Sequence, residues 1–361
     1  MAKLTRIVDA LPATVPFVGP EAQERARGRA FAARIGANEN VFGPSPRAIA
    51  AMQAEAAHAW KYGDPENYDL RHAIAAHHGV AAQNVMLGEG IDGLLGTALR
   101  LLIEAGDKVV TSLGGYPTFN FHVAGLGAEL VTVPYASDHE DGLSLVARAG
   151  QAGAKVIYFA NPDNPMGSWH NADYVARVIA NVPQGAVLFL DEAYGEFAPQ
   201  DTLPPMCVEN PQVLRFRTFS KAYGLAGMRV GYCLGHKDLI AAFDRVRNHF
   251  GIGRVAQAGA LAALQDQNWL AEVVVEVNSS KQRISKIARE NGFTPLASAT
   301  NFVAIDCGKD GAYAKSVLEK LIAADVFVRM PGIAPLNRCI RISAGTEAEL
   351  NTLTTALPAA R

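Results

Sequence analysis

The stretch RTFSKAYGLAGMRVGY, residues 217–232, places a lysine among small and apolar residues. Lys221 directly follows Ser220, and Arg229 lies further along the same stretch. A lysine near other cations in a partly dry site loses its proton readily, and the neutral amine is a nucleophile toward an aldehyde. Ser220 and Arg229 can both donate hydrogen bonds to a phosphate group. The stretch therefore predicts a reactive lysine beside a phosphate site.

Polar side chains also follow two apolar segments elsewhere in the chain. LFLDEAYGEF, residues 188–197, runs into Asp191 and Tyr194, and YFANPDNPMG, residues 158–167, contains Asn164. A carboxylate at the end of a buried strand is costly to desolvate unless it meets a cation. A structural acid that caps a helix is the alternative for Asp191, and a simple turn is the alternative around Asn164.

A third segment, GEGIDGLLGTALRLLIEAGD at 88–107, has apolar residues at helical spacing after two glycines. Gly90, Ile91 and Asp92 lie where this helix is expected to begin. The first N–H groups of a helix are free to bind an anion, which the helix dipole also favours. Glycines that only mark a tight turn are the alternative.

Pyridoxal 5′-phosphate combines the groups that these residues can bind, namely an aldehyde, a phosphate and a ring nitrogen that a carboxylate can keep protonated. We expect Lys221 to bond to the aldehyde and Asp191 to keep the pyridine nitrogen protonated, which makes the ring an electron sink. The other expected cofactor-binding residues are Gly90, Ile91, Asp92, Thr218, Ser220 and Arg229, with Asn164 and Tyr194 at the phenolic oxygen and Phe119 stacked on the ring.

Short apolar segments alternate with helical patterns from about residue 85, at 108–113, 128–135, 155–161, 186–194, 213–219 and 229–235. Such alternation predicts an α/β domain with a mostly parallel sheet, whose ligands bind at the carboxyl ends of the strands. We expect an irregular N-terminal arm over 1–34, a large α/β domain over 35–255, and a smaller α+β domain over 256–361 that packs with the arm.

Composition excludes several classes of function. The chain has 361 residues, 49% of them hydrophobic, and a formal net charge of −2. Without a concentrated positive face or a long apolar run, neither nucleic acid nor a membrane is an expected partner. The four cysteines are scattered, and no set of ligands has metal spacing, so we expect reduced thiols, a cytoplasmic location and no metal.

The motifs NPDNPMG, LDEAY and SKAYGLAGMRVGY, in this order, resemble those of the fold type I aminotransferases of class I/II. The resemblance is greatest to the histidinol-phosphate aminotransferase branch, and it runs from GANENVFGPSP at 36–46 to CIRISAGT at 339–346. It implies that Arg341 binds the substrate's carboxylate or phosphate. It also implies that Asn38 and Glu39 close over the substrate, and that Tyr62 reaches the cofactor phosphate of a second subunit in a homodimer.

The resemblance implies a two-stage transamination. Lys221 would move a proton as general base and acid, and a 2-oxo acid such as 2-oxoglutarate would accept the amino group. Val41 and Met166 depart from the usual motifs, and His249, Phe250 and Arg254 lie in a stretch that differs from other members and is expected at the substrate entrance or dimer interface. Histidinol phosphate is the leading donor. The alternatives are aromatic or other amino acids, decarboxylation of a phosphorylated amino acid, and a non-catalytic effector-binding module.

Overall fold

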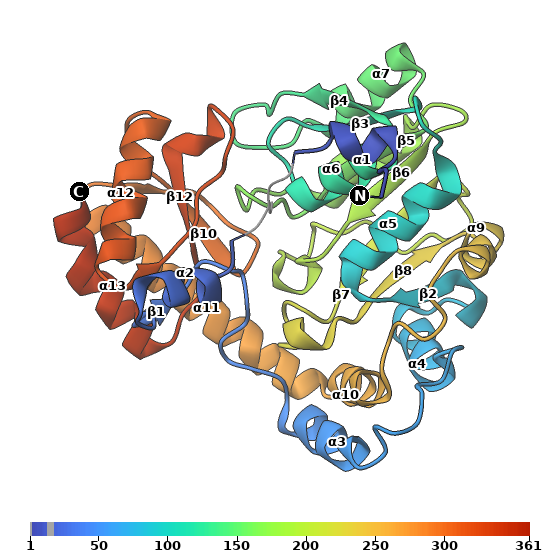
Figure 1. Ribbon diagram of the computed structural model, residues 1–361, viewed down its shortest axis with the longest axis horizontal. Coiled ribbons are helices and arrows are strands. Elements are labelled where there is room, and N and C mark those ends of the chain that lie inside the picture. The colour runs from blue at the N-terminus through green and yellow to red at the C-terminus, as the bar shows by residue number, and fades with distance from the viewer. Residues whose placement is uncertain (1, 13–17) are drawn as a thin grey trace.

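The computed structural model describes residues 2–12 and 18–361 and centres on a seven-stranded sheet (Figure 1). The strand order is β2-β8-β7-β6-β5-β3-β4, in which β8 alone runs antiparallel to its neighbours. The strands are β2 (Val85–Gly88), β3 (Lys108–Ser112), β4 (Glu129–Val133), β5 (Val156–Ala160), β6 (Val187–Asp191), β7 (Val213–Thr218) and β8 (Gly231–Gly235). The predicted α/β fold with a mostly parallel sheet is confirmed.

Both faces of this sheet are covered by helices, which explains why its strands are apolar at consecutive positions. Val109 packs in a core with α5 (Gly90–Leu102) and α6 (Pro117–Gly125), whereas Val110 packs in a second core with α7 (Gly142–Ala152) and α8 (Ala172–Ala180). A third core lies around β2 and β8. It is formed with α3 (Pro46–Ala56), α4 (Tyr68–His78) and α10 (Arg254–Gln265), while α9 (Lys237–Ala242) follows β8.

The C-terminal part forms a separate antiparallel sheet of order β12-β10-β9, drawn in orange and red in Figure 1. Its elements are β9 (Thr294–Pro295), β10 (Phe302–Asp306), α12 (Gly311–Ala323), β11 (Val326–Phe327), β12 (Cys339–Ser343) and α13 (Glu347–Ala360). Thr346 and Glu349 form a capping box at the start of α13. Helices and an antiparallel sheet together make this part α+β.

The long helix α11 (Gln267–Glu290) joins the two parts (Figure 1). Val273 and Val277 pack in the core of the large sheet, and Ile284 and Ile287 pack in the C-terminal core. The preceding helix α10 packs on α3. We therefore propose that the boundary between the parts lies within α11 rather than at residue 255.

The N-terminal residues are more ordered than the proline-rich sequence predicts. They contain α1 (Arg6–Ala10) and α2 (Pro20–Arg27), with Pro20 in the first turn of α2, where a missing N–H group costs nothing. Strand β1 (Ala33–Arg34) then pairs with β11, and in Figure 1 it lies with α2 among the C-terminal elements. Strand β1 thus joins the small C-terminal part, whereas α1 packs on α6 of the large part.

Two further observations concern the described residues only. None of their helices is long and apolar enough to cross a bilayer. All four cysteines are free; Cys233, Cys307 and Cys339 are buried, and Cys207 is exposed.

Candidate active site

The carboxyl ends of β5, β6 and β7 open into one cavity of about 580 Å³, which Lys221 lines. The Lys221 Nζ donates a hydrogen bond to the backbone carbonyl of Asn38, 3.0 Å away. Among the described residues no carboxylate forms an ion pair with it. Burial, together with the charges of Arg341 and Arg229, lowers the pKa of Lys221 to about 8. The amine is thus readily obtained in its neutral, nucleophilic form.

Asp191 ends strand β6 at the floor of the same cavity. Its Oδ2 accepts a hydrogen bond from the Tyr158 hydroxyl at 2.5 Å, and its Oδ1 accepts one from the Ala193 N–H at 2.9 Å. Burial raises the pKa of Asp191 to about 6. Because no arginine or lysine in residues 2–12 and 18–361 pairs with Asp191, this carboxylate is suited to a cationic group of a ligand.

Arg229, Ser220 and the start of α5 form the opposite end of the cavity. The Arg229 Nη1 donates to the Ser220 Oγ at 3.3 Å. A Cβ on Gly90 would lie 2.3 Å from the Arg229 Nη2, and Gly90 has a φ of +73°, so only glycine leaves room for the guanidinium there. Thr218 lines the cavity, and its Oγ1 accepts from the Ser220 N–H at 3.0 Å. Together these groups make a cradle suited to a phosphate.

The aromatic wall of the cavity is Tyr116 and not the predicted Phe119. Phe119 is fully buried in the sheet core, where it stacks on Tyr158 with ring centroids 4.4 Å apart. Tyr116 lines the cavity, and its hydroxyl donates to the Asp92 Oδ1 at 2.7 Å. The prediction for Phe119 is therefore wrong. Both aromatics belong to one segment that turns into α6, and the turn faces the cavity while the helix faces the core.

Asn164 and Tyr194 lie in the cavity as predicted, and both are tied to substrate-side residues. The Asn164 Oδ1 accepts a hydrogen bond from the Arg341 Nη1. The Tyr194 hydroxyl accepts from the Asn38 Nδ2 at 3.0 Å, and burial raises the pKa of Tyr194 to about 12. Tyr194 is thus a neutral hydroxyl that can still donate to a ligand oxygen.

An adjoining cavity shares Lys221, Asn164, Tyr116 and Asp92 with the first and is lined also by Asn38, Arg329 and Arg341. Its open volume is about 1730 Å³. The Arg341 Nε is buried without a hydrogen-bond partner, and burial lowers the pKa of Arg341 to about 10. A guanidinium whose Nε is buried, and which forms no ion pair with a carboxylate of the described residues, is suited to an anionic substrate. Arg329 was not predicted, because a single arginine in a short strand pattern gives no signal by itself.

Two of the residues implied by the resemblance lie away from both cavities. The Glu39 side chain is exposed, and only its backbone carbonyl is engaged, by the Asn301 Nδ2 at 3.1 Å. Tyr62 is 79% exposed, and its ring packs on Phe250 with centroids 5.0 Å apart. Neither side chain lines a cavity of its own chain, although the charge of Glu39 raises the pKa of Lys221.

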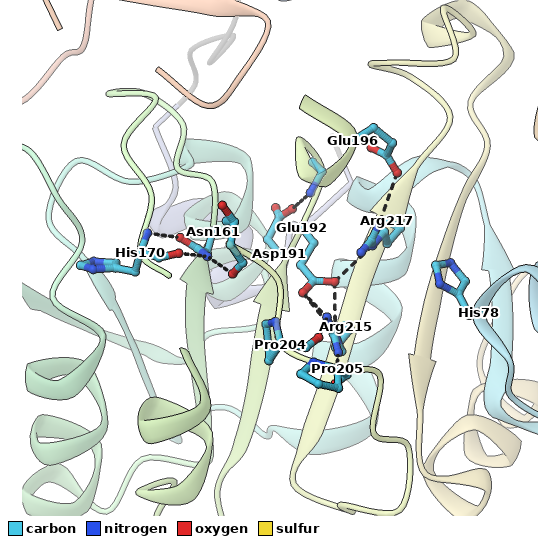
Figure 2. A network of polar contacts seen from close by, with 12 residues as sticks. His78, Asn161, His170, Asp191, Glu192, Glu196, Pro204, Pro205, Arg215 and Arg217 are labelled. Carbon is cyan, nitrogen blue, oxygen red and sulfur yellow. Dashed lines mark hydrogen bonds and ion pairs between the residues drawn. The ribbon is translucent and has the colours of Figure 1, made fainter. Parts of the chain in front are cut away.

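A buried ladder of ion pairs stands beside Asp191 (Figure 2). Glu192 is fully buried and accepts from Arg215 at 2.6 Å and from Arg217 at 3.2 Å, and Arg217 also pairs with Glu196 at 3.2 Å. Because Asp191 and Glu192 are consecutive, their side chains point to opposite sides of the strand end. The ladder therefore fixes the backbone from which Asp191 reaches the cavity.

Comparison with known proteins shows to which family this chain belongs. The family model for aminotransferase class I and II matches residues 33–357. The chain belongs to the class I and II aminotransferases. This membership confirms the family predicted from the motifs and, with it, the prediction of a transaminase rather than a non-catalytic module.

Relatives of this aminotransferase include histidinol-phosphate aminotransferase 1 of Mesorhizobium japonicum, which is 34% identical over 88% of this chain and 87% of the relative. The histidinol-phosphate aminotransferase of Anaeromyxobacter sp. is 34% identical over 95% of this chain and 94% of the relative.

Among solved structures, the histidinol-phosphate aminotransferase of Sinorhizobium meliloti in complex with pyridoxal 5′-phosphate has a TM-score of 0.97 and 53% identity, covering 100% of this chain and 98% of that one. The aspartate aminotransferase of Thermus thermophilus with maleate has a TM-score of 0.84 at 20% identity over the whole of both chains, which supports the fold alone. These likenesses confirm the fold type I architecture.

Proposed function

We propose that this aminotransferase uses pyridoxal 5′-phosphate to move the amino group of histidinol phosphate to a 2-oxo acid such as 2-oxoglutarate. The observation that carries the proposal is the position of Lys221. Its amine, with a pKa of about 8, lies in a cavity with buried Asp191, and the adjoining cavity holds Arg341. The cofactor prediction agrees with the pyridoxal phosphate complex of the Sinorhizobium meliloti relative.

The cavity fits pyridoxal phosphate at both of its ends. The gap that Gly90 leaves in front of the Arg229 guanidinium, together with Ser220 and the start of α5, suits the phosphate. Asp191, held by Tyr158 and Ala193, suits a protonated ring nitrogen, and Tyr116 supplies an aromatic face. A carboxylate at one end and cations at the other match the charges of this cofactor.

When bound, the cofactor supplies an aldehyde that takes up the amino group and a ring that delocalises the charge developing at the substrate's α-carbon. We assign the proton transfer to the Lys221 amine, which is positioned by the carbonyl of Asn38. Asp191 holds the ring-nitrogen proton in place. Asn164 and Tyr194, each bonded to a substrate-side residue, orient the ring oxygen.

Two neighbouring arginines support a phosphorylated donor. Arg329 and Arg341 line one cavity, and the charge of Arg329 lowers the pKa of Arg341. Two guanidiniums that line one cavity can both donate hydrogen bonds to an anion of more than one charge, which a phosphate monoester supplies. The dicarboxylate 2-oxoglutarate suits the same pair. A donor with a single carboxylate, such as phenylalanine, balances the two charges less well.

The test is a comparison of L-histidinol phosphate with L-histidinol, which differ only in the phosphate group. With 2-oxoglutarate as acceptor, kcat/KM is expected to be at least about 100-fold higher for the phosphate ester, since each hydrogen bond to a charged group is worth about 1.5–3 kcal/mol. Equal values would overturn the substrate assignment. Phenylalanine and tyrosine test the aromatic alternative, and release of carbon dioxide from a phosphorylated amino acid would indicate the decarboxylase alternative.

A homodimer with shared sites is the second part of the proposal. Trp60 and Tyr62 are each 79% exposed and Phe250 is 53% exposed, and such exposed aromatics are typical of an interface. We infer that Tyr62 completes the cavity of a second copy. Mixing inactive Lys221→Ala and Tyr62→Ala proteins should then restore activity, because each hybrid contains one site with both residues intact. No recovery after subunit exchange, verified by mass, would contradict the sharing of sites.

We also propose a cytoplasmic location. The support is chemical, because none of the four thiols is paired with another and a reducing compartment preserves them. Cell fractionation with activity measurements tests the location, and recovery of the enzyme outside the cytoplasm would contradict it.

A further inference from the structure

Two buried carboxyl groups lie behind the loop that carries Asn164. Glu140 and Asp163 are each 1% exposed, and both are hydrogen-bonded to the Tyr135 hydroxyl, at 3.5 Å and 2.9 Å. Neither forms an ion pair with a lysine, arginine or histidine among the residues that the structure describes. Two carboxylates in contact in a dry interior cannot both ionise at neutral pH, because the desolvation and repulsion energies add.

The hydrogen bonds show which oxygen atoms accept. The Asp163 Oδ1 accepts from Tyr135 at 2.9 Å, and its Oδ2 accepts from the Met166 N–H at 3.0 Å. The Glu140 Oε2 accepts from the Ala160 N–H at 3.2 Å. The Glu140 Oε1 lies 3.5 Å from the Tyr135 hydroxyl that also donates to Asp163, and burial, with the charge of Asp163, raises the pKa of Glu140 well above its usual 4.5. This pattern fits a protonated Glu140 whose Oε1–H donates to an ionised Asp163.

Arg341 is a cation that interacts electrostatically with Asp163 of this pair. The charge of Arg341 lowers the pKa of Asp163, and in return Asp163 raises that of Arg341. The loop between Asp163 and Met166 holds Asn164, whose Oδ1 accepts from Arg341. Asp163 therefore lies on the loop that contacts Arg341, and Glu140 acts on Arg341 through Asp163.

The other groups near the pair do not supply a counter-charge. Tyr135 and Tyr158 are neutral, because burial raises the pKa of both phenols well above 10. Tyr194 is neutral as well, with its pKa raised to about 12. His170 reaches only the backbone carbonyl of Glu140, at 2.7 Å, and burial lowers the pKa of His170 below 6.5, so it is neutral at pH 7.

We propose that Glu140 and Asp163 share one proton, and that this proton controls how strongly Arg341 binds the anionic substrate. With the proton present, the pair carries one negative charge and holds Arg341 in place. When the proton is lost, the second charge competes with the substrate for Arg341 and strains the loop at Asn164. Glu140 and Asp163 are thus positioning residues, and their effect belongs in KM rather than in kcat. The substrate effect rests on the proposed function.

Glu140→Gln tests the shared proton directly, because glutamine imitates protonated glutamate. Its amide can donate to Asp163 while its oxygen accepts from Ala160. The wild-type KM for histidinol phosphate is expected to rise above the KM of Glu140→Gln as pH increases from 6 to 9, by at most about tenfold per pH unit, the limit for one proton. The titration of Lys221 affects both proteins and cancels in the ratio. A constant ratio would overturn the proposal.

The pH dependence of Tm, measured without substrate, detects the shared proton independently of the proposed activity. Folded Glu140 keeps its proton to a higher pH than in the unfolded chain, where its value is 4.5. The wild type therefore loses stability relative to Glu140→Gln as pH rises above about 4.5, and the Tm of the variant should exceed that of the wild type by a growing margin. A margin that does not change with pH contradicts the shared proton even if the enzyme proves to use another donor.

Two further variants make the result interpretable. Asp163→Asn removes the second carboxylate, whose charge raises the pKa of Glu140, so the rise of KM with pH should begin at a lower pH than in the wild type. This shift is the test if Glu140→Gln does not fold. Glu196→Gln is the control, because it removes a buried carboxylate that pairs with Arg217 instead. It is expected to keep the wild-type pH dependence of KM. Loss of the dependence in Glu196→Gln as well would show that burial of any carboxylate, and not this pair, is responsible.

Discussion

The amine of Lys221 donates a hydrogen bond to the backbone carbonyl of Asn38 across a distance of 3.0 Å. Asn38 follows β1, which pairs with β11 of the C-terminal part, and its amide N–H donates to the Ser343 Oγ on β12 at 2.9 Å. Lys221 itself follows β7 of the large sheet. The reactive amine is therefore held between the two parts of the molecule, and a movement of one against the other would reposition it.

The pKa of Lys221, about 8, predicts the pH dependence of cofactor capture. The neutral fraction of the amine is roughly one tenth at pH 7, so the rate at which the apoprotein bonds pyridoxal phosphate should rise about tenfold per pH unit below 8 and level off above it. Arg341→Met removes a nearby positive charge, so the profile should shift to higher pH. Stopped-flow absorbance measures both profiles.

Lys281 is a matched control for this experiment. Burial lowers its pKa to about 8 too, but it lies on α11 outside both active-site cavities and donates to the Ser298 carbonyl at 2.9 Å. Lys281→Met should leave the capture profile unchanged. If it abolishes the dependence on pH, the reactive lysine has been misidentified.

Asp191→Asn is expected to lower kcat and to raise the unfolding temperature of the apoprotein. Losing the charge that holds the ring-nitrogen proton should lower kcat by roughly 10- to 100-fold, the range of a hydrogen bond to a charged group. Burial raises the pKa of Asp191 from 3.8 to about 6, so ionising it destabilises the folded apoprotein progressively as pH rises from 3.8 to 6. The variant should therefore unfold at a higher temperature than the wild type at pH 8.

The two parts of this expectation are measured separately. At pH 4 the advantage in Tm should be much smaller, because folded Asp191 is protonated and the unfolded carboxyl group, with its pKa of 3.8, is only partly ionised. Calorimetry at the two pH values provides the comparison. A variant that is less stable than the wild type at pH 8 would show that the bonds from Tyr158 and Ala193 outweigh the cost of burying the charge.

Arg329→Met should raise KM more for an amino donor with a phosphate group than for a donor with a single carboxylate. Because Arg329 and Arg341 line one cavity, removal of Arg329 should raise KM for histidinol phosphate by about 10- to 100-fold, the value of one hydrogen bond to a charged group. The KM for a donor with one carboxylate, such as phenylalanine, should change much less. Steady-state kinetics with both donors gives the answer, and equal losses would place Arg329 in a purely structural role.

Glu192→Gln should destabilise the protein strongly although Glu192 lines neither cavity. The substitution leaves Arg215 and Arg217 buried without their carboxylate, and breaking a buried ion pair in this way typically costs about 3–5 kcal/mol. The midpoint of urea unfolding measures the loss. Glu290→Gln, which removes an exposed pair with Lys286, should change stability by less than about 0.5 kcal/mol. Similar effects of the two would contradict the structural role of the ladder.

The residues at the ends of strands could be predicted from the sequence because the strand pattern itself places them. Lys221, Asp191 and Asn164 follow apolar segments of neighbouring parallel strands, and the strand ends meet at one edge of the sheet. Tyr116 was missed in favour of Phe119, because the orientation of two aromatics at a turn into a helix depends on where the helix begins.

Long-range contacts account for the other omissions. Glu140 lies close to Asp163 because β4 and β5 end at the same edge of the sheet. The residues next to each of them in the sequence give no sign of this contact. The position of α10 was likewise unpredictable, since its alanine- and glycine-rich face could pack on any helix and the fold places it on α3. Tyr62 and Glu39 depend on a resemblance, and within one chain their side chains reach neither cavity.

The most direct test of the central claim is the visible absorption of the purified protein with pyridoxal phosphate during titration with L-histidinol phosphate in the absence of an oxo acid. The proposed function predicts that the absorbance of the lysine-bound cofactor falls, that one equivalent of oxo product forms per site, and that 2-oxoglutarate restores the absorbance. Lys221→Ala should show neither change. A wild-type protein that captures no pyridoxal phosphate, or a Lys221→Ala protein that behaves like the wild type, would contradict the account.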